Sequence, residues 1–112
     1  MEKTTNKSNT MAQKRFNVEF VKRNLFPSGR RIKERVFADF VWLGTTEEVV
    51  KRAKDIVRPL FGSGEYGDNR MLSFSDIEIH EGGFMIWYNV QYFDEVLAQK
   101  INEEVVIQAI EM

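Results

Sequence analysis

Residues 45–60 read TTEEVVKRAKDIVRPL and carry the clearest helix signal in the chain. Thr45 and Glu48 have the spacing of a capping box, in which each side chain can bond the other's backbone amide. Apolar residues then recur every three or four positions, which is the period of a helix packed by one face. They are Val49, Val50, Ala53, Ile56, Val57 and Leu60. The stretch predicts a helix that ends or bends at Pro59.

The residues before this helix are typical of a β-hairpin. Arg15 to Asn24 alternates apolar and polar residues, which indicates a half-buried strand. Pro27 to Gly29 has turn chemistry, and residues 31–43 are rich in β-branched and aromatic residues. We therefore expect two antiparallel strands joined by a loop of several residues.

The residues after the helix predict a second pair of strands. A polar, glycine-rich loop spans Gly62 to Arg70, and Met71 to His80 is typical of a strand. The apolar phase of this strand slips near Ser75, which indicates a β-bulge. Glu81 to Gly83 predicts a tight turn, and Phe84 to Phe93 a fourth strand.

The C-terminal residues favour a second helix followed by a strand. Asp94 can cap a helix that carries Val96, Leu97 and Ile101. Residues 105–107 are all β-branched, which predicts a short last strand. A longer helix that continues to the C-terminus is the alternative for residues 105–111.

These elements predict an α+β fold in the order ββαββα, with a final strand. We expect a mostly antiparallel sheet of four or five strands with two helices. From residue 31 onward the order matches the ferredoxin-like arrangement, preceded by an extra N-terminal strand. Two ββα halves related by rough symmetry are the alternative. Residues 14–112 are expected to form one domain behind a disordered polar tail, residues 1–13.

The composition is that of an ordinary globular protein, and it contains no cysteine. Disulfides and thiolate sites are therefore excluded. No apolar run reaches the roughly 18 residues of a membrane span, and no signal peptide is evident, so we expect a cytoplasmic protein without a membrane partner. The small size and plain composition suggest an accessory protein of a phage or mobile element.

The charges are divided unevenly along the chain. Residues 1–60 carry 14 basic and 7 acidic residues, whereas residues 61–112 carry 2 basic and 10 acidic residues. Two interpretations follow: a nucleic-acid face beside an acidic face, or two halves that pair with each other inside one fold.

Three titratable residues share one face of the predicted third strand: Asp76, Glu78 and His80. Two carboxylates and an imidazole can bind a divalent metal, so these are the weak metal candidates, and a small metal-dependent enzyme is a remote alternative. Because His80 is the single histidine, a typical zinc site or a Ser/His relay is excluded. We expect a solvated face here, with no catalytic residue and no cofactor.

A group of cations surrounds the turn of the first hairpin, residues 22–35. They are Lys22, Arg23, Arg30, Arg31, Lys33 and Arg35. Clustered cations can bind a phosphate backbone, so nucleic-acid binding is the alternative function. Against it, the whole chain is slightly acidic, whereas nucleic-acid-binding domains are usually strongly basic.

The fourth strand is apolar on both of its faces, and so is the second. Two helices can cover only one face of a small sheet, so we expect another surface to pack on the second face. The predicted interface residues are Trp42, Met85, Trp87, Tyr88, Tyr92 and Phe93. The leading hypothesis is therefore a non-catalytic protein-binding or regulatory module, which acts on another protein or as a homodimer through an aromatic sheet face.

Overall fold

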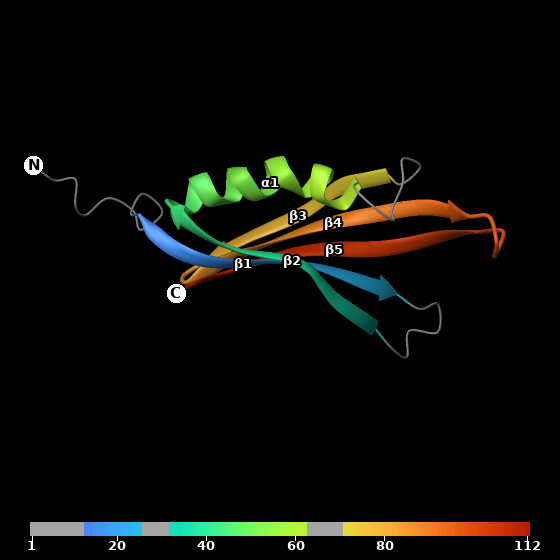
Figure 1. Cartoon of the computed structure of the whole chain (residues 1–112), viewed down its shortest axis with the longest axis horizontal. Coiled ribbons are helices and arrows are strands. Elements are labelled where there is room, and N and C mark those ends of the chain that lie inside the picture. Colours follow the sequence, from blue (N-terminus) through green and yellow to red (C-terminus); the bar gives the residue numbers. More distant parts are fainter. Residues whose placement is uncertain (1–12, 26–31, 63–70) are drawn as a thin grey trace, which may run out of the picture.

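The computed structural model describes residues 13–25, 32–62 and 71–112. They form five strands and one helix, listed here in chain order: β1 (Lys14–Leu25), β2 (Ile32–Gly44), α1 (Thr46–Gly62), β3 (Met71–His80), β4 (Gly83–Asp94) and β5 (Gln99–Glu111). Residues 1–12 of the predicted tail, the first hairpin's turn at 26–31 and the polar loop at 63–70 lie outside the described residues. The helix lies along one face of the sheet (Figure 1).

All five strands belong to one antiparallel sheet in the order β2-β1-β5-β4-β3. β1 and β2 form the predicted hairpin, and β3, β4 and β5 form a meander. The two units are joined by pairing of β5 with β1. The described part of the chain contains no helix that is long and apolar enough to cross a membrane.

The predicted second helix is absent from the described residues, and the ββαββα order is wrong. Residues 95–98 form the turn of a hairpin, and Ala98 closes it with a left-handed φ of 55°. β5 then runs to Glu111, so the whole predicted helix from Asp94 is replaced by turn and strand. The physical reason is burial. A helix there would bury only three apolar residues, whereas a strand pairs with β1 on one side and with β4 on the other and is buried between them.

The ferredoxin-like arrangement is therefore also wrong, because its second helix is missing and its last connection is a hairpin. β5 occupies the centre of the sheet, between β1 and β4. Val105, Val106 and Ile107 are all buried, although they point alternately to opposite faces. Their consecutive apolar side chains match a strand with neighbours on both sides.

The helix α1 begins as predicted. The Thr45 amide donates to Glu48 Oε1 at 2.9 Å, and the Glu48 amide donates to Thr45 Oγ1 at 3.1 Å, which completes the capping box. Pro59 does not end the helix, which continues to Gly62. Its last turn is held by Phe61, whose buried ring packs edge-on against Phe37 at 6.1 Å.

The core lies between α1 and the sheet. From the helix it takes Val49, Ala53, Val57 and Phe61, and from the sheet mainly the aromatic and β-branched residues of one face. Among the described residues, the sheet members are Phe16, Val18, Phe20, Trp42, Leu72, Phe84, Ile86, Tyr88, Val90, Val105, Ile107 and Ala109. We call this side of the sheet the covered face.

Two irregularities set the phase of the strands. The predicted bulge in β3 is confirmed, since the register with β4 skips Ser75. A second shift, in the β1–β2 pairing after Phe20, leaves Phe37 as the extra residue. Gly83 begins β4 so close to β5 that an added Cβ would lie 2.0 Å from the Ala109 carbonyl oxygen.

Candidate protein-interaction surface

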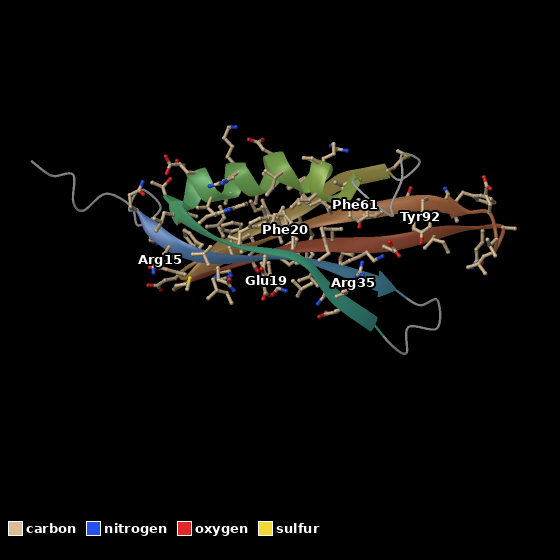
Figure 2. The ribbon with its side chains drawn as sticks, in the orientation of Figure 1. Arg15, Glu19, Phe20, Arg35, Phe61 and Tyr92 are labelled. Carbon is tan, nitrogen blue, oxygen red and sulfur yellow. The ribbon has the colours of Figure 1, made fainter. Side chains whose placement is uncertain are left out.

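The face of the sheet opposite α1 is the candidate site, and we call it the uncovered face. No helix of the described chain lies on it (Figure 1). Figure 2 shows Arg15 and Glu19 on this side of β1, whereas Phe20 points between the sheet and α1. The strand pairings assign the other members, because residues opposite one another on neighbouring strands share a face.

A row of apolar residues crosses four strands in the middle of the uncovered face. Val36 of β2 pairs with Val21 of β1, which pairs with Val106 of β5, which pairs with Trp87 of β4. Val21 is 3% exposed and Val106 is 1% exposed, although neither belongs to the core beneath α1. This valine row (Val36, Val21, Val106 and Trp87) is a second, smaller apolar cluster.

Other apolar side chains on the uncovered face lie open to solvent. Val41 is 57% exposed, Leu43 is 67% exposed and Ile110 is 62% exposed. Val41 and Ile110 both lie opposite Asn17 on β1, so the three share one transverse row. Exposed apolar residues gathered on one face are typical of an interaction surface.

The six predicted interface residues divide between the two faces. Met85, Trp87 and Phe93 lie on the uncovered face, and Phe93 is 54% exposed. Trp42 and Tyr88 are buried on the covered face, where they belong to the core. Tyr92 is a half-buried residue of the covered face, and its hydroxyl donates to Glu103 Oε2 at 3.4 Å. Half of the predicted set therefore lies on the candidate surface.

Tyr88 is buried beside the aromatic ring of Phe74, which meets it edge-on at 5.8 Å between centroids. Burial raises the pKa of Tyr88 above its ordinary value of 10.0, while Arg58 lowers it and Asp55 raises it to lesser extents. The Tyr88 hydroxyl is therefore protonated near neutral pH.

A row of carboxylates lies beside the valine row on the uncovered face. Asp39 of β2 lies opposite Glu19 of β1, and the same transverse row continues through Gln108 of β5 and Met85 of β4 to Glu78 at the far edge, on β3. Neither Glu19 nor Asp39 makes an ion pair with any residue that the structure describes. Like charges directly opposite each other destabilise a sheet, so this pair carries a cost in the free protein.

The uneven charge along the sequence is explained in part by pairing within the fold. Ion pairs join β1 to β5: Lys14 to Glu111 at 3.5 Å, Lys22 to Glu103 at 3.8 Å and Arg23 to Glu104 at 3.2 Å. These contacts support the interpretation that the basic and acidic halves pair with each other.

The predicted nucleic-acid residues do not gather on one face. Lys22 and Arg35 lie on the covered face, and Arg23 on the uncovered face. The Arg23 guanidinium donates to Glu34 Oε2 at 2.7 Å and to Glu104 Oε1 at 3.2 Å. Both hydrogen bonds raise the pKa of Arg23, and the bond to Glu34 has the larger effect. Arg30, Arg31 and the side chain of Lys33 lie outside the described residues.

The predicted metal candidates Asp76, Glu78 and His80 share the uncovered face of β3, as the alternation predicts. All three are exposed. Asp76 Oδ1 accepts from the Ile77 amide at 2.8 Å, and His80 Nδ1 lies 3.1 Å from the Glu81 carbonyl oxygen. Within the described ranges, no group of three or more potential ligands is placed to hold a metal ion.

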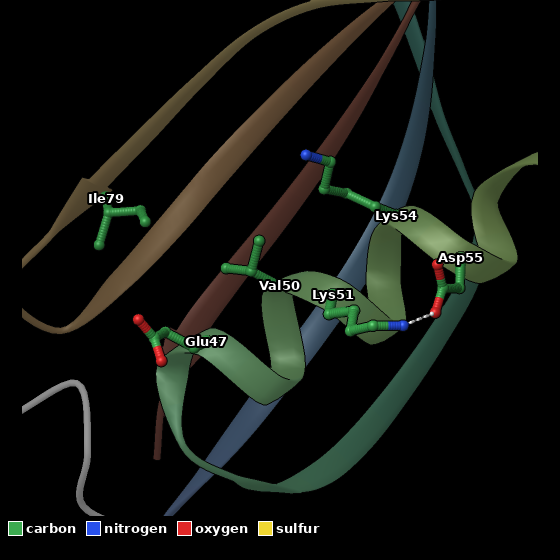
Figure 3. A pocket seen from close by; sticks show the side chains of 6 residues that line it. All are labelled: Glu47, Val50, Lys51, Lys54, Asp55 and Ile79. Carbon is green, nitrogen blue, oxygen red and sulfur yellow. Dashed lines mark hydrogen bonds and ion pairs between the residues drawn. The ribbon is translucent and has the colours of Figure 1, made fainter.

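A groove of 370 Å³ lies on the covered face, between α1 and the edge strand β3 (Figure 3). Its apolar lining is Val50 and Ile79, and its charged rim includes Lys51 and Asp55, which bond each other at 2.8 Å. The groove exists because a single helix does not span five strands. None of the described side chains that line it is a serine, cysteine or histidine, so the lining offers no typical nucleophile–base pair.

Sequence reasoning missed the valine row and the carboxylate row. The signal for the first was present: Val105, Val106 and Ile107 are consecutive, and so require burial on both faces of a strand. The opposition of Glu19 and Asp39 depends on the hairpin register, which no local pattern shows. Comparisons with protein-family models, with curated proteins and with solved structures gave no match.

Proposed function

We propose that this protein is a non-catalytic binding module that associates, with a protein partner or with a second copy, through the uncovered face of its sheet. The observation that carries the proposal is that Val41, Leu43 and Ile110 are each more than half exposed on this face. Burying such side chains on association removes apolar surface from water at about 25 cal/mol per Å².

The residues around these exposed side chains support the proposal. Val21 and Val106, the central pair of the valine row, are buried without a helix above them, so the centre of the face is a firm apolar floor. A firm floor lowers the ordering cost that a partner must meet when it binds. A regulatory role, a phage or mobile-element origin and a cytoplasmic location stay predictions from the sequence.

Nucleic-acid binding receives less support from the described residues. Two of the proposed cations, Lys22 and Arg23, form ion pairs with acidic residues of β5, and they lie on opposite faces. Phosphate would also be repelled by the carboxylates of the uncovered face.

Site-specific photo-cross-linking in cells of the source organism tests the proposal. A photoreactive phenylalanine analogue replaces Val41 on the uncovered face, and in a matched control it replaces Lys51 of α1, which is also exposed but lies on the opposite side of the sheet. We expect a discrete adduct from position 41 and none from position 51.

The mass of the adduct distinguishes the two forms of association. An adduct of twice the chain mass indicates a second copy, and light scattering of the purified protein should then show a dimer. Any other discrete mass indicates a different protein. Equal cross-linking from both positions, or none from position 41, would overturn the proposed function.

A further inference from the structure

From the charges around the valine row we infer that the partner of the uncovered face is a basic segment of another protein, with lysine or arginine side chains spaced between apolar ones. This inference rests on the proposed function and specifies the chemistry of the partner. It commits to a foreign polypeptide rather than to a second copy of this chain.

The uncovered face places an apolar floor between two charged rows. The valine row runs across four strands, and the row with Asp39, Glu19 and Glu78 lies along one side of it. On the other side, Glu34 and Glu104 flank Arg23. A segment that lies across the strands would set apolar side chains on the valines and present cations to the flanking carboxylates.

The uncovered face carries more carboxylates than cations. The described side chains of the uncovered face include six carboxylates, Glu19, Glu34, Asp39, Asp76, Glu78 and Glu104. Three cations share the face with them: Arg15, Arg23 and Lys100. The face is therefore acidic, and complementary potential favours a basic partner over a neutral or acidic one.

The same charges disfavour a second copy of the chain as the occupant of this face. A second copy packed face to face would bring one acidic surface against another, which costs free energy unless the carboxylates take up protons. Glu19 and Asp39 already oppose each other in the free protein. A lysine or arginine placed between them would relieve this repulsion as well as form new ion pairs, so the gain is specific to a cationic partner.

The test uses two synthetic peptides as probes. One is a ten-residue peptide that alternates lysine and valine, and the other has glutamate at each lysine position. Each is titrated into the full chain at low salt while nitrogen–proton NMR spectra are recorded. We expect the lysine peptide to shift the Trp87 indole resonance and the amides of Val21 and Val106, and we expect the glutamate peptide to leave them in place.

A pair of double variants assigns the effect to the carboxylate row. Glu19→Gln with Asp39→Asn should weaken binding of the lysine peptide about tenfold, since two exposed ion pairs together contribute on that order. The matched control is Glu47→Gln with Glu95→Gln, which changes the net charge equally on α1 and on the β4–β5 turn. The control should bind like the unaltered protein. Salt at 0.5 M, where the Debye length is about 4 Å, should screen the charges and weaken binding of the lysine peptide to all variants.

Three results would overturn the inference: equal binding of both peptides, shifts confined to the covered face, or the same loss in the control as in the Glu19/Asp39 variant. No binding of the lysine peptide at low salt would also overturn it. The proposed function is tested separately, by the cross-linking experiment at position 41. Cross-links from position 41 together with any of these results would leave association standing and remove only the basic partner, whereas missing cross-links would remove association itself.

Discussion

Val106 of β5 lies directly opposite Val21 of β1 on the face of the sheet that no described helix covers, and both side chains are buried. Because the sheet is completed by β5, this pair joins the two halves of the molecule. Val106→Ala should lower the free energy of unfolding by about 2 kcal/mol, the value of burying a side chain of this size. Urea denaturation measures it. Val41→Ala is the control, which should change stability by less than about 0.5 kcal/mol because Val41 is exposed.

Gly83→Ala should destabilise the protein strongly. The added Cβ would lie 2.0 Å from the Ala109 carbonyl oxygen, which is backbone of the neighbouring strand, so the two strands must separate. We expect a loss of about 3 kcal/mol in urea denaturation. Gly82→Asn is the control. A Cβ added at Gly82 would have no atom within 4 Å, and asparagine tolerates the positive φ of this position. A cost for Gly83→Ala no larger than that for Gly82→Asn would contradict the clash.

Asp39→Asn should stabilise the protein, because it removes the like charge opposite Glu19. The expected gain is about 0.5 kcal/mol at low salt, and it should disappear as salt is added. Glu19→Gln should give a similar gain, and the double variant should gain less than the sum of the two. Strict additivity in the cycle would show that the two carboxylates do not interact.

Tyr88→Phe should reduce the loss of stability at alkaline pH. Burial raises the pKa of Tyr88 in the folded protein, so its contribution is complete below the ordinary value of 10.0 and is lost as pH rises toward the higher folded value. Between these two pKa values the unaltered protein should lose at most about 1.4 kcal/mol per pH unit through this residue. Urea denaturation from pH 9 to 11 should show a shallower decline for the variant, and parallel curves would argue against the shift.

Much of the fold could be predicted from local patterns. The alternation in β1, the phase slip in β3 and the capping box of α1 are all features of neighbouring residues, and all agree with the structure. The prediction was wrong after Asp94, where the outcome depends on distant partners. Val96, Leu97 and Ile101 fit a helix, but pairing of β5 with both β4 and β1 buries more apolar surface.

The candidate surface was predicted only in part for a related reason. Alternation correctly separates Trp87 from Tyr88, but it does not say which of the two lies beneath the helix. That choice depends on where α1 lies across the finished sheet. The carboxylate row was out of reach for the same reason, because Glu19, Asp39 and Glu78 come from three strands and share a row only after all five have paired.

The position of β5 also determines when this protein can fold during translation. Both of the strands that β5 joins, β1 and β4, leave the ribosome before it does. Until β5 follows, β1–β2 and β3–β4 are separate hairpins, each with an unpaired inner edge and an apolar side exposed to other nascent chains. The closing contacts join Phe16 to Glu111, nearly the whole length of the described chain, so they form late and slowly. A ribosome that stalls before β5 would therefore release an aggregation-prone fragment that cannot form the folded sheet.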